Sequence, residues 1–168
     1  VAGQFLRQIL GQDLTTTHPV HGTSLRKLQW AAQLHEIGSH IAHSDYHKHG
    51  AYILDNADAA GFSLSEMHRL SLLVLGHRGK LRKLEAALEI DDLVLQLLCL
   101  RLAVILCHAR REPDLQGMVL RRAHPQSRTL ELQCRPGWAT AFPQSAYLLQ
   151  EEMALWQKTP WTLEVLGL

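Results

Sequence analysis

The sequence has little net charge and few cysteines, and both shortages narrow its possible functions. Its 168 residues carry a formal net charge of +1 at pH 7. This balance excludes a generally basic surface of the kind that binds nucleic acid, and it makes any anion site a local feature. The three cysteines, Cys99, Cys107 and Cys134, form no CxxC pair and are odd in number. We therefore expect reduced core cysteines in a cytoplasmic protein.

The sequence shows no pattern typical of a secretory leader or of a membrane-spanning segment. No basic stretch followed by an apolar run and a small-residue cleavage site opens the chain, and its first residue is Val1 rather than Met. The most apolar segment, residues 93–107, is too short and too closely flanked by charges to span a bilayer. We expect no membrane span, and a chain that begins inside a helix of a longer protein.

Helical periodicity, by contrast, dominates the first two thirds of the sequence. An apolar stripe predicts a first helix that ends before Gly11. Thr23 or Ser24 is placed to cap a second helix, and Gly38 offers it a left-handed stop.

Three further helices are predicted, from Ser44 toward Asp58, from the capping box Ser63-Leu64-Ser65-Glu66 to about Gly76, and over residues 93–107. The last of these is apolar on nearly every side, so it is expected at the centre of a bundle. Asp91 or Asp92 would cap it, and Pro113 prevents its continuation.

After Pro113 the pattern changes to the alternation typical of strands. We predict a hairpin from residues 118–122 and 129–133, a helix over residues 144–157 and a third strand over residues 161–166. The predicted fold class is mainly α, with a helical bundle over residues 1–113 and a small α+β unit over residues 114–168. Trp138, Trp156 and Trp161 are expected to cover the core of this unit or a subunit contact.

Histidines are concentrated in residues 34–54, which hold five of the eleven beside Glu36. Imidazoles bind metals, move protons and hold phosphates near neutral pH. His35 lies on the apolar face of its helix and is expected to point inward, either as a core histidine or as a ligand. His43 and His47 are four residues apart and could share a metal, or this spacing is a coincidence of the surface. We favour the second interpretation and expect no metal.

A basic run over residues 77–83 is the second candidate, with four fixed cations in a loop or at a helix start. Such a cluster suits a polyanion, which is bound through several Lys and Arg contacts that release counterions; the alternative is ordinary solubility. Lys48 and His49 either contact phosphate or belong to a solvated helix face. Arg101 interrupts an apolar helix and needs a charged or carbonyl partner, for which Glu36 is a candidate.

Four motifs follow one another in a recognisable order: Leu34-His35-Glu36-Ile37-Gly38, the HxHxxY arrangement of His47, His49 and Tyr52, the step Gly76-His77-Arg78, and the helix Leu100-Arg101-Leu102-Ala103-Val104-Ile105-Leu106. Together they resemble the C-terminal region of the exopolyphosphatase and guanosine pentaphosphate phosphohydrolase (Ppx/GppA) family. The resemblance covers most of the chain. It implies a helical module related to HD-type phosphohydrolases, followed by a small α+β domain.

The resemblance also implies how function is divided in the whole protein. In that family two actin-like domains that precede this region hydrolyse terminal phosphates, while this region binds long polyphosphate chains and forms a homodimer. No glycine-rich phosphate loop and no Ser-His-Asp or Cys-His pair is indicated here. We therefore expect no catalytic residue and no cofactor in this chain, and a divalent cation such as Mg²⁺ in the parent enzyme. Its substrate is either polyphosphate or guanosine pentaphosphate.

The candidate phosphate-binding residues, taken from these motifs and the basic run, are His35, Glu36, His47, Lys48, His49, His77, Arg78, Lys80, Arg82 and Lys83. Two other functions stay open. The chain could be a metal-dependent HD-type phosphohydrolase, although Glu36 replaces the usual Asp and Ala109-Arg110 stands where metal-binding relatives carry Ala-Asp. It could also be a purely structural or dimerisation module, in which the histidines only pack.

Overall fold

The elements of the computed structural model, which describes residues 1–11 and 20–168, follow the predicted order of helices and then mixed helix and strand. They are α1 (Ala2–Gly11), α2 (Val20–Leu34), the 3-10 helix η1 (Ile37–His40), α3 (Tyr46–Asn56), α4 (Leu64–Gly76), the 3-10 helix η2 (Leu81–Glu89), α5 (Asp91–Leu106), β1 (Val119–Arg122), β2 (Thr129–Gln133), α6 (Trp138–Ala141), α7 (Pro143–Trp156) and β3 (Thr162–Leu166). The mainly α fold class with a small C-terminal α+β unit is confirmed.

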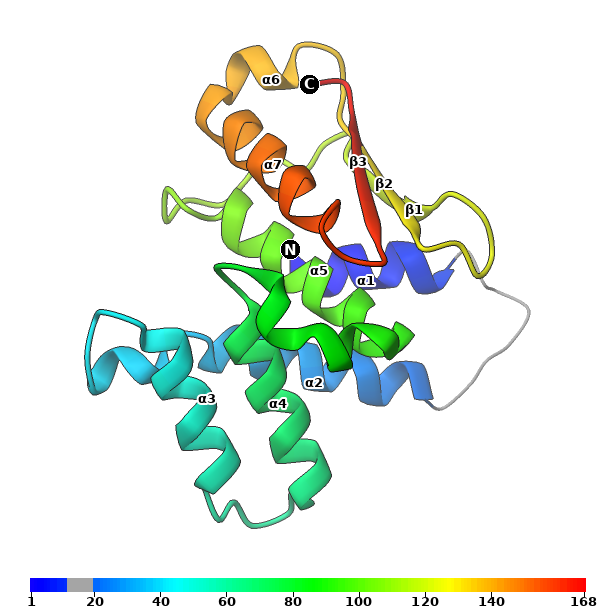
Figure 1. The fold of residues 1–168 in the computed structure, drawn as a ribbon. Coiled ribbons are helices and arrows are strands. Elements are labelled where there is room, and N and C mark those ends of the chain that lie inside the picture. Colours follow the sequence, from blue (N-terminus) through cyan, green and yellow to red (C-terminus); the bar gives the residue numbers. More distant parts are fainter. Residues whose placement is uncertain (12–19) are drawn as a thin grey trace.

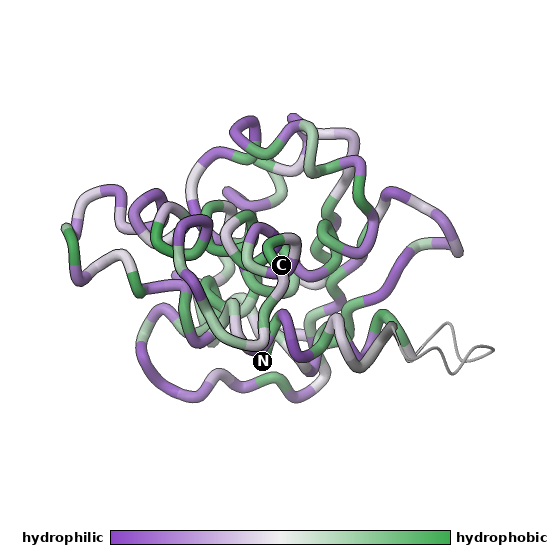
Figure 2. Tube along the Cα trace, turned by 90° about the horizontal axis from the view of Figure 1, so that it is seen from below, coloured by the Kyte–Doolittle hydropathy of each residue, from purple (hydrophilic) through white to green (hydrophobic). Residues whose placement is uncertain are grey.

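Helix α5 is the centre of the fold. Its residues 93–102 are all buried, because this run is apolar on nearly every side of the helix. Helices α1, α2, α4 and α7 pack around it, and the α3–α4 pair projects from one end of the molecule (Figure 1). Hydrophobic residues gather toward the middle of the trace and hydrophilic residues mark the outer loops (Figure 2).

The sheet has the order β1-β2-β3 and contains both kinds of strand pairing. The predicted hairpin is confirmed: β1 and β2 are antiparallel, with Leu120 opposite Leu132. The predicted third strand, β3, runs parallel to β2 and places Leu163 beside Leu130. A parallel pair needs a long crossover, which α6 and α7 supply.

Apolar side chains of the bundle and of the C-terminal unit belong to one buried cluster, which contains Leu98 of α5 as well as Leu132 of β2. All three tryptophans predicted to cover the C-terminal core are buried in it, since Trp138, Trp156 and Trp161 expose 2% or less of their surface. The boundary between residues 113 and 114 stays a prediction.

The predicted capping box is right, but the single-residue helix starts are not: Ile90 precedes α5 in place of Asp91 or Asp92, and Asp45 precedes α3 in place of Ser44. The capping box is confirmed, because the Ser63 hydroxyl accepts from the Glu66 amide and the Glu66 carboxylate accepts from the Ser63 amide. Helix α2 begins at Val20, before the predicted caps Thr23 and Ser24. The Ser24 hydroxyl instead donates to the Asp92 carboxylate over 3.0 Å, so it ties α2 to α5.

Candidate phosphate-binding site

The start of α3 is held against η1 by a close backbone contact at Gly38. A Cβ atom at this position would overlap the carbonyl oxygen of Tyr46 and the amide nitrogen of Gly50. Gly38 does not have a positive φ, so the predicted left-handed stop is wrong. Glycine is needed because the two segments approach too closely for a side chain.

This contact brings the first turn of α3 toward the end of α2 and the end of α4, where four rings meet. The His77 ring lies 5.1 Å from that of His35, 5.5 Å from that of Tyr46 and 6.4 Å from that of His47, measured between centroids. The predicted inward orientation of His35 is supported by its edge-to-face contact with His77, although its side chain is only partly buried.

Hydrogen bonds at His77 define its neutral tautomer. Nδ1 lies 2.6 Å from the Val74 carbonyl oxygen, which can only accept, so Nδ1 carries the proton and Nε2 accepts from the Tyr46 hydroxyl over 3.3 Å. Burial lowers the pKa of His77 to about 3, and the Val74 hydrogen bond opposes that shift only in part. His77 is therefore an uncharged part of the wall of the site at neutral pH.

Three cations from different elements gather beside these rings. The pKa of Lys83 is lowered to about 8, first by burial and then by the positive charges of Arg101, Lys48 and Arg78. The pKa of His47 is lowered first by burial and then by the charges of Lys83 and Arg78. We call His47, Lys48, Arg78 and Lys83 the basic cluster.

Few acidic groups balance the basic cluster. Asp45 pairs with the Lys48 ammonium over 3.0 Å, and this contact is the main cause of the lowered pKa of Asp45. Arg78 lies with its guanidinium 4.9 Å from the centroid of the Tyr46 ring. The buried Nδ1 atom of His47 has no hydrogen-bond partner among the described residues. Asp45 offsets one of the three fixed cations, so the cluster keeps a net positive charge, which an anion site needs.

The structure separates the predicted phosphate-binding residues into two groups. His35, His47, Lys48, His77, Arg78 and Lys83 come together, and His49 is partly buried in the first turns of α3. The cations of both groups are exposed, but neither Lys80 nor Arg82 is among those that chiefly lower the pKa of His47 or of Lys83. Glu36 is exposed and lines a cavity together with His35 and Tyr46. Tyr46 was not predicted, because no local pattern distinguishes it from a surface tyrosine.

The candidate pair between Arg101 and Glu36 is wrong. Arg101 donates from Nε and Nη2 to the two carboxylate oxygens of Glu152 in α7, over 2.5 and 2.7 Å. Its Nη1 donates to the carbonyl oxygens of Gly76 and Gly79, over 2.7 and 3.1 Å. The partner comes from the C-terminal unit, 51 residues further along the chain.

A cavity of about 560 Å³ contains the residues that a metal-dependent relative would use. His35, Glu36 and Arg110 line it together with His108. A guanidinium in this position repels a divalent cation, and the residues do not fit a catalytic metal. Within residues 1–11 and 20–168, no three His, Cys, Asp or Glu side chains are grouped to hold a metal ion. The HD relationship stays a prediction.

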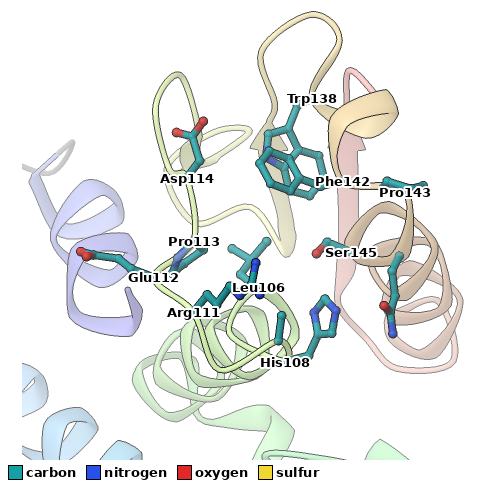
Figure 3. Close-up of a pocket in the computed structure, with 12 residues that line it drawn as sticks. Leu106, His108, Arg111, Glu112, Pro113, Asp114, Trp138, Phe142, Pro143 and Ser145 are labelled. Carbon is teal, nitrogen blue, oxygen red and sulfur yellow. The ribbon is translucent and has the colours of Figure 1, made fainter.

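A second cavity, of about 400 Å³, lies between the end of α5 and the start of α7 (Figure 3). Leu106, Trp138 and Phe142 form its apolar part, and His108 and Ser145 lie at its edge. No residue predicted to bind phosphate lines this cavity.

The cysteines are free in the structure. Cys99 and Cys134 are buried, as predicted, whereas Cys107 is only partly buried. Burial raises the thiol pKa of all three, that of Cys134 to about 11. No helix in the described ranges has the length and apolar character needed to cross a membrane.

The fold and the site define a mainly helical domain with a basic cluster at the start of one helix. Comparison with known proteins identifies the family of this domain. The family model for Ppx/GppA phosphatase, domain III, matches residues 1–153. A guanosine-5'-triphosphate,3'-diphosphate pyrophosphatase of Pseudoalteromonas translucida (strain TAC 125) is 34% identical over 160 residues. The chain belongs to the Ppx/GppA phosphatase family and corresponds to its domain III. The aligned part covers 93% of this chain and 32% of that relative, so the chain spans about a third of the relative's length.

Proposed function

We propose that this chain is a C-terminal accessory domain of a phosphoanhydride hydrolase, and that its basic cluster binds polyphosphate. The observation that supports this proposal most strongly is the gathering of cations from separate elements, since the Lys83 ammonium donates to the Arg78 carbonyl oxygen over 2.9 Å. Burial and then the charges of Arg101, Lys48 and Arg78 lower the pKa of Lys83 to about 8. Cations held together in this way gain from a bound polyanion, which relieves their repulsion and releases its own counterions.

The shape of the cluster favours a chain of phosphates over a single phosphate. Lys48 projects from α3, Arg78 from the turn after α4 and Lys83 from η2. An extended ligand with repeated charges can contact all of them at once. The fixed charges of Lys and Arg keep each contact favourable at neutral pH.

Titration of the chain with polyphosphate at rising salt concentration tests the ligand. We expect binding that weakens with salt, with a slope of roughly 0.7 per phosphate contact in a plot of log affinity against log salt. The Arg78→Ala/Lys83→Ala variant should lose most of this affinity. The Lys80→Ala/Arg82→Ala variant changes the charge of the same run equally, and we expect it to keep most of the affinity. Equal losses in the two variants, or no binding at low salt, would contradict the proposed site.

Guanosine pentaphosphate and orthophosphate serve as comparison ligands in the same titration. The cations of the cluster come from three elements and suit a long run of charges, so we expect polyphosphate to bind more tightly than guanosine pentaphosphate and orthophosphate to bind least. Tighter binding of guanosine pentaphosphate would assign the site to the nucleotide instead.

We propose that hydrolysis in the intact cytoplasmic protein is carried out by preceding actin-like domains that use a divalent cation such as Mg²⁺. The chain matches domain III of the family, and it aligns with 32% of a longer pyrophosphatase. Both findings support such a division. An assay of orthophosphate release from polyphosphate and guanosine pentaphosphate tests it. We expect no turnover by this chain with Mg²⁺ present, and steady turnover would contradict the division.

We also propose that the chain forms a homodimer through the α3–α4 region. Ile41, Tyr52 and Leu64 expose 58%, 69% and 86% of their surface there, and a second copy of the chain would cover them. Sedimentation at micromolar concentration should show a dimer that Tyr52→Ser weakens. Tyr147→Ser, at a similarly exposed position of α7, is the matched control. A monomer in the unmodified chain would rule out the dimer.

A further inference from the structure

The turn that carries Arg78 is held by hydrogen bonds from two charged side chains, Arg101 of α5 and Lys83 of η2. Arg101 Nη1 donates to the carbonyl oxygens of Gly76 and Gly79, on both sides of Arg78. Lys83 Nζ donates to the carbonyl oxygen of Arg78 itself, over 2.9 Å. Gly79 has a φ of +74°, which lets the chain reverse direction immediately after Arg78. The Arg101 guanidinium therefore fixes the path of this turn.

The guanidinium is in turn fixed by Glu152 of α7. Two hydrogen bonds join the flat edge of Arg101 to the carboxylate, and Trp156 Nε1 donates to Glu152 Oε1 over 2.6 Å. Arg101 and Glu152 each expose only 3% of their surface. A planar guanidinium can bind a carboxylate along one edge and carbonyl oxygens with the remaining nitrogen, and an ammonium cannot do both.

Net stability does not explain this arrangement well. Desolvation of two buried charges offsets most of their attraction, and apolar residues of similar volume often replace such pairs at no loss of stability. The pair instead fixes the position of the turn, because Arg101 connects the Glu152 carboxylate of the C-terminal unit to the two carbonyl oxygens that flank Arg78. Arg101 is also the first of the charges that lower the pKa of Lys83, so its guanidinium lies close to the basic cluster.

We propose that Arg101 and Glu152 are positioning residues of the anion site, through which α7 fixes the turn that presents Arg78 beside Lys83. This inference rests on the proposed function, because it assigns the pair a role in phosphate binding. It also makes the C-terminal unit part of the site, although no residue of that unit belongs to the basic cluster.

The Arg101→Met/Glu152→Gln double variant tests the proposal without changing the net charge or removing a cation of the cluster. Gln at position 152 keeps an acceptor for the Trp156 indole. We expect a melting temperature close to that of the unmodified chain, faster amide hydrogen exchange in residues 77–83, and a polyphosphate affinity reduced by about tenfold, the value of one misplaced charge-assisted contact. The Arg121→Met/Glu131→Gln variant removes an exposed pair of the sheet, and we expect it to change none of these quantities.

The outcomes separate this inference from the proposed function. Unchanged exchange and unchanged affinity in the double variant would overturn the positioning role. The double variant could show faster exchange in residues 77–83 while the unmodified chain binds no polyphosphate. This result would support control of the turn by Arg101 and Glu152, and it would show that polyphosphate is not the ligand. Where the double variant does not fold, Arg101→Lys keeps the charge but not the planar fork: reduced affinity then supports the proposal, and full affinity overturns it.

Discussion

The His77 ring stands edge-on to the His35 ring, with 5.1 Å between the centroids and an interplanar angle of 80°. Both imidazoles donate from Nδ1 to a carbonyl oxygen three residues earlier, His35 to Ala32 and His77 to Val74. Burial lowers the pKa of His77 to about 3, so this ring stays neutral beside His35 except in strong acid.

Stability is expected to fall as pH decreases below about 6.5. The pKa of His77 is about 3 in the folded chain, against 6.5 for an unperturbed imidazole. Between these values the unfolded chain binds a proton that the folded chain does not, so acid favours unfolding, by at most about 1.4 kcal/mol per pH unit. Urea unfolding at pH 7 and pH 5 measures the slope. His77→Gln should flatten it, whereas His124→Gln, at an exposed position, should not. Equal slopes in both variants would contradict this assignment.

Polyphosphate affinity is expected to fall as pH rises above 8. The pKa of Lys83 is about 8 in the free chain, and a phosphate contact requires the protonated amine. Because binding must restore the proton, affinity is expected to fall by about fivefold between pH 8 and pH 9. Titration at pH 7, 8 and 9 checks this. Lys83→Arg keeps its charge at every one of these pH values, so its affinity should stay level. A decline of the same size in Lys83→Arg would place the titrating group elsewhere.

Gly38→Ala should be strongly destabilising. The new Cβ would overlap backbone atoms of Tyr46 and Gly50, which cannot move independently of α3, so we expect a loss of about 3 kcal/mol or more. Gly3→Ala is the matched control: nothing lies within 4 Å of a Cβ there, and the change should be neutral or stabilise α1 by up to about 1 kcal/mol. Urea unfolding of both variants measures the difference, and a Gly38→Ala variant as stable as Gly3→Ala would show that the close approach is not rigid.

Metal binding is expected to be far below one ion per chain. His35 and Glu36 share their cavity with Arg110, whose charge opposes a divalent cation. Elemental analysis after incubation with manganese, zinc or iron and subsequent desalting measures the content. His35→Ala should lower stability by about 1–2 kcal/mol, because it removes a hydrogen bond and a ring contact, and should leave the metal content unchanged. A stoichiometric metal that disappears in His35→Ala would favour the metal-dependent alternative.

The sequence indicated which types of residue form the site, but it did not decide which individual residues belong to it. His35, His47, Lys48, His77, Arg78 and Lys83 were all predicted and do meet. Glu36, Lys80 and Arg82 occur in the same motifs, yet Glu36 lines a cavity with Arg110, and Lys80 and Arg82 are not among the cations that chiefly lower the pKa of Lys83. Neighbours along an irregular turn can face opposite directions, and only the packing of the turn decides which of them enter a site.

The sequence by itself determined helices α1 to α5 and α7, the capping box at Ser63, the hairpin and the buried character of α5, but not the short helices η1, η2 and α6. These features depend on side chains a few residues apart and on a periodic apolar pattern, so a short segment of sequence is enough to predict each of them. Tertiary structure alone decided that Arg101 binds Glu152 instead of Glu36, that Gly38 is required by a close approach, and that His77 stays neutral. Each of these depends on which distant segments pack together, because a buried charge or ring takes its partner and its pKa from the elements around it.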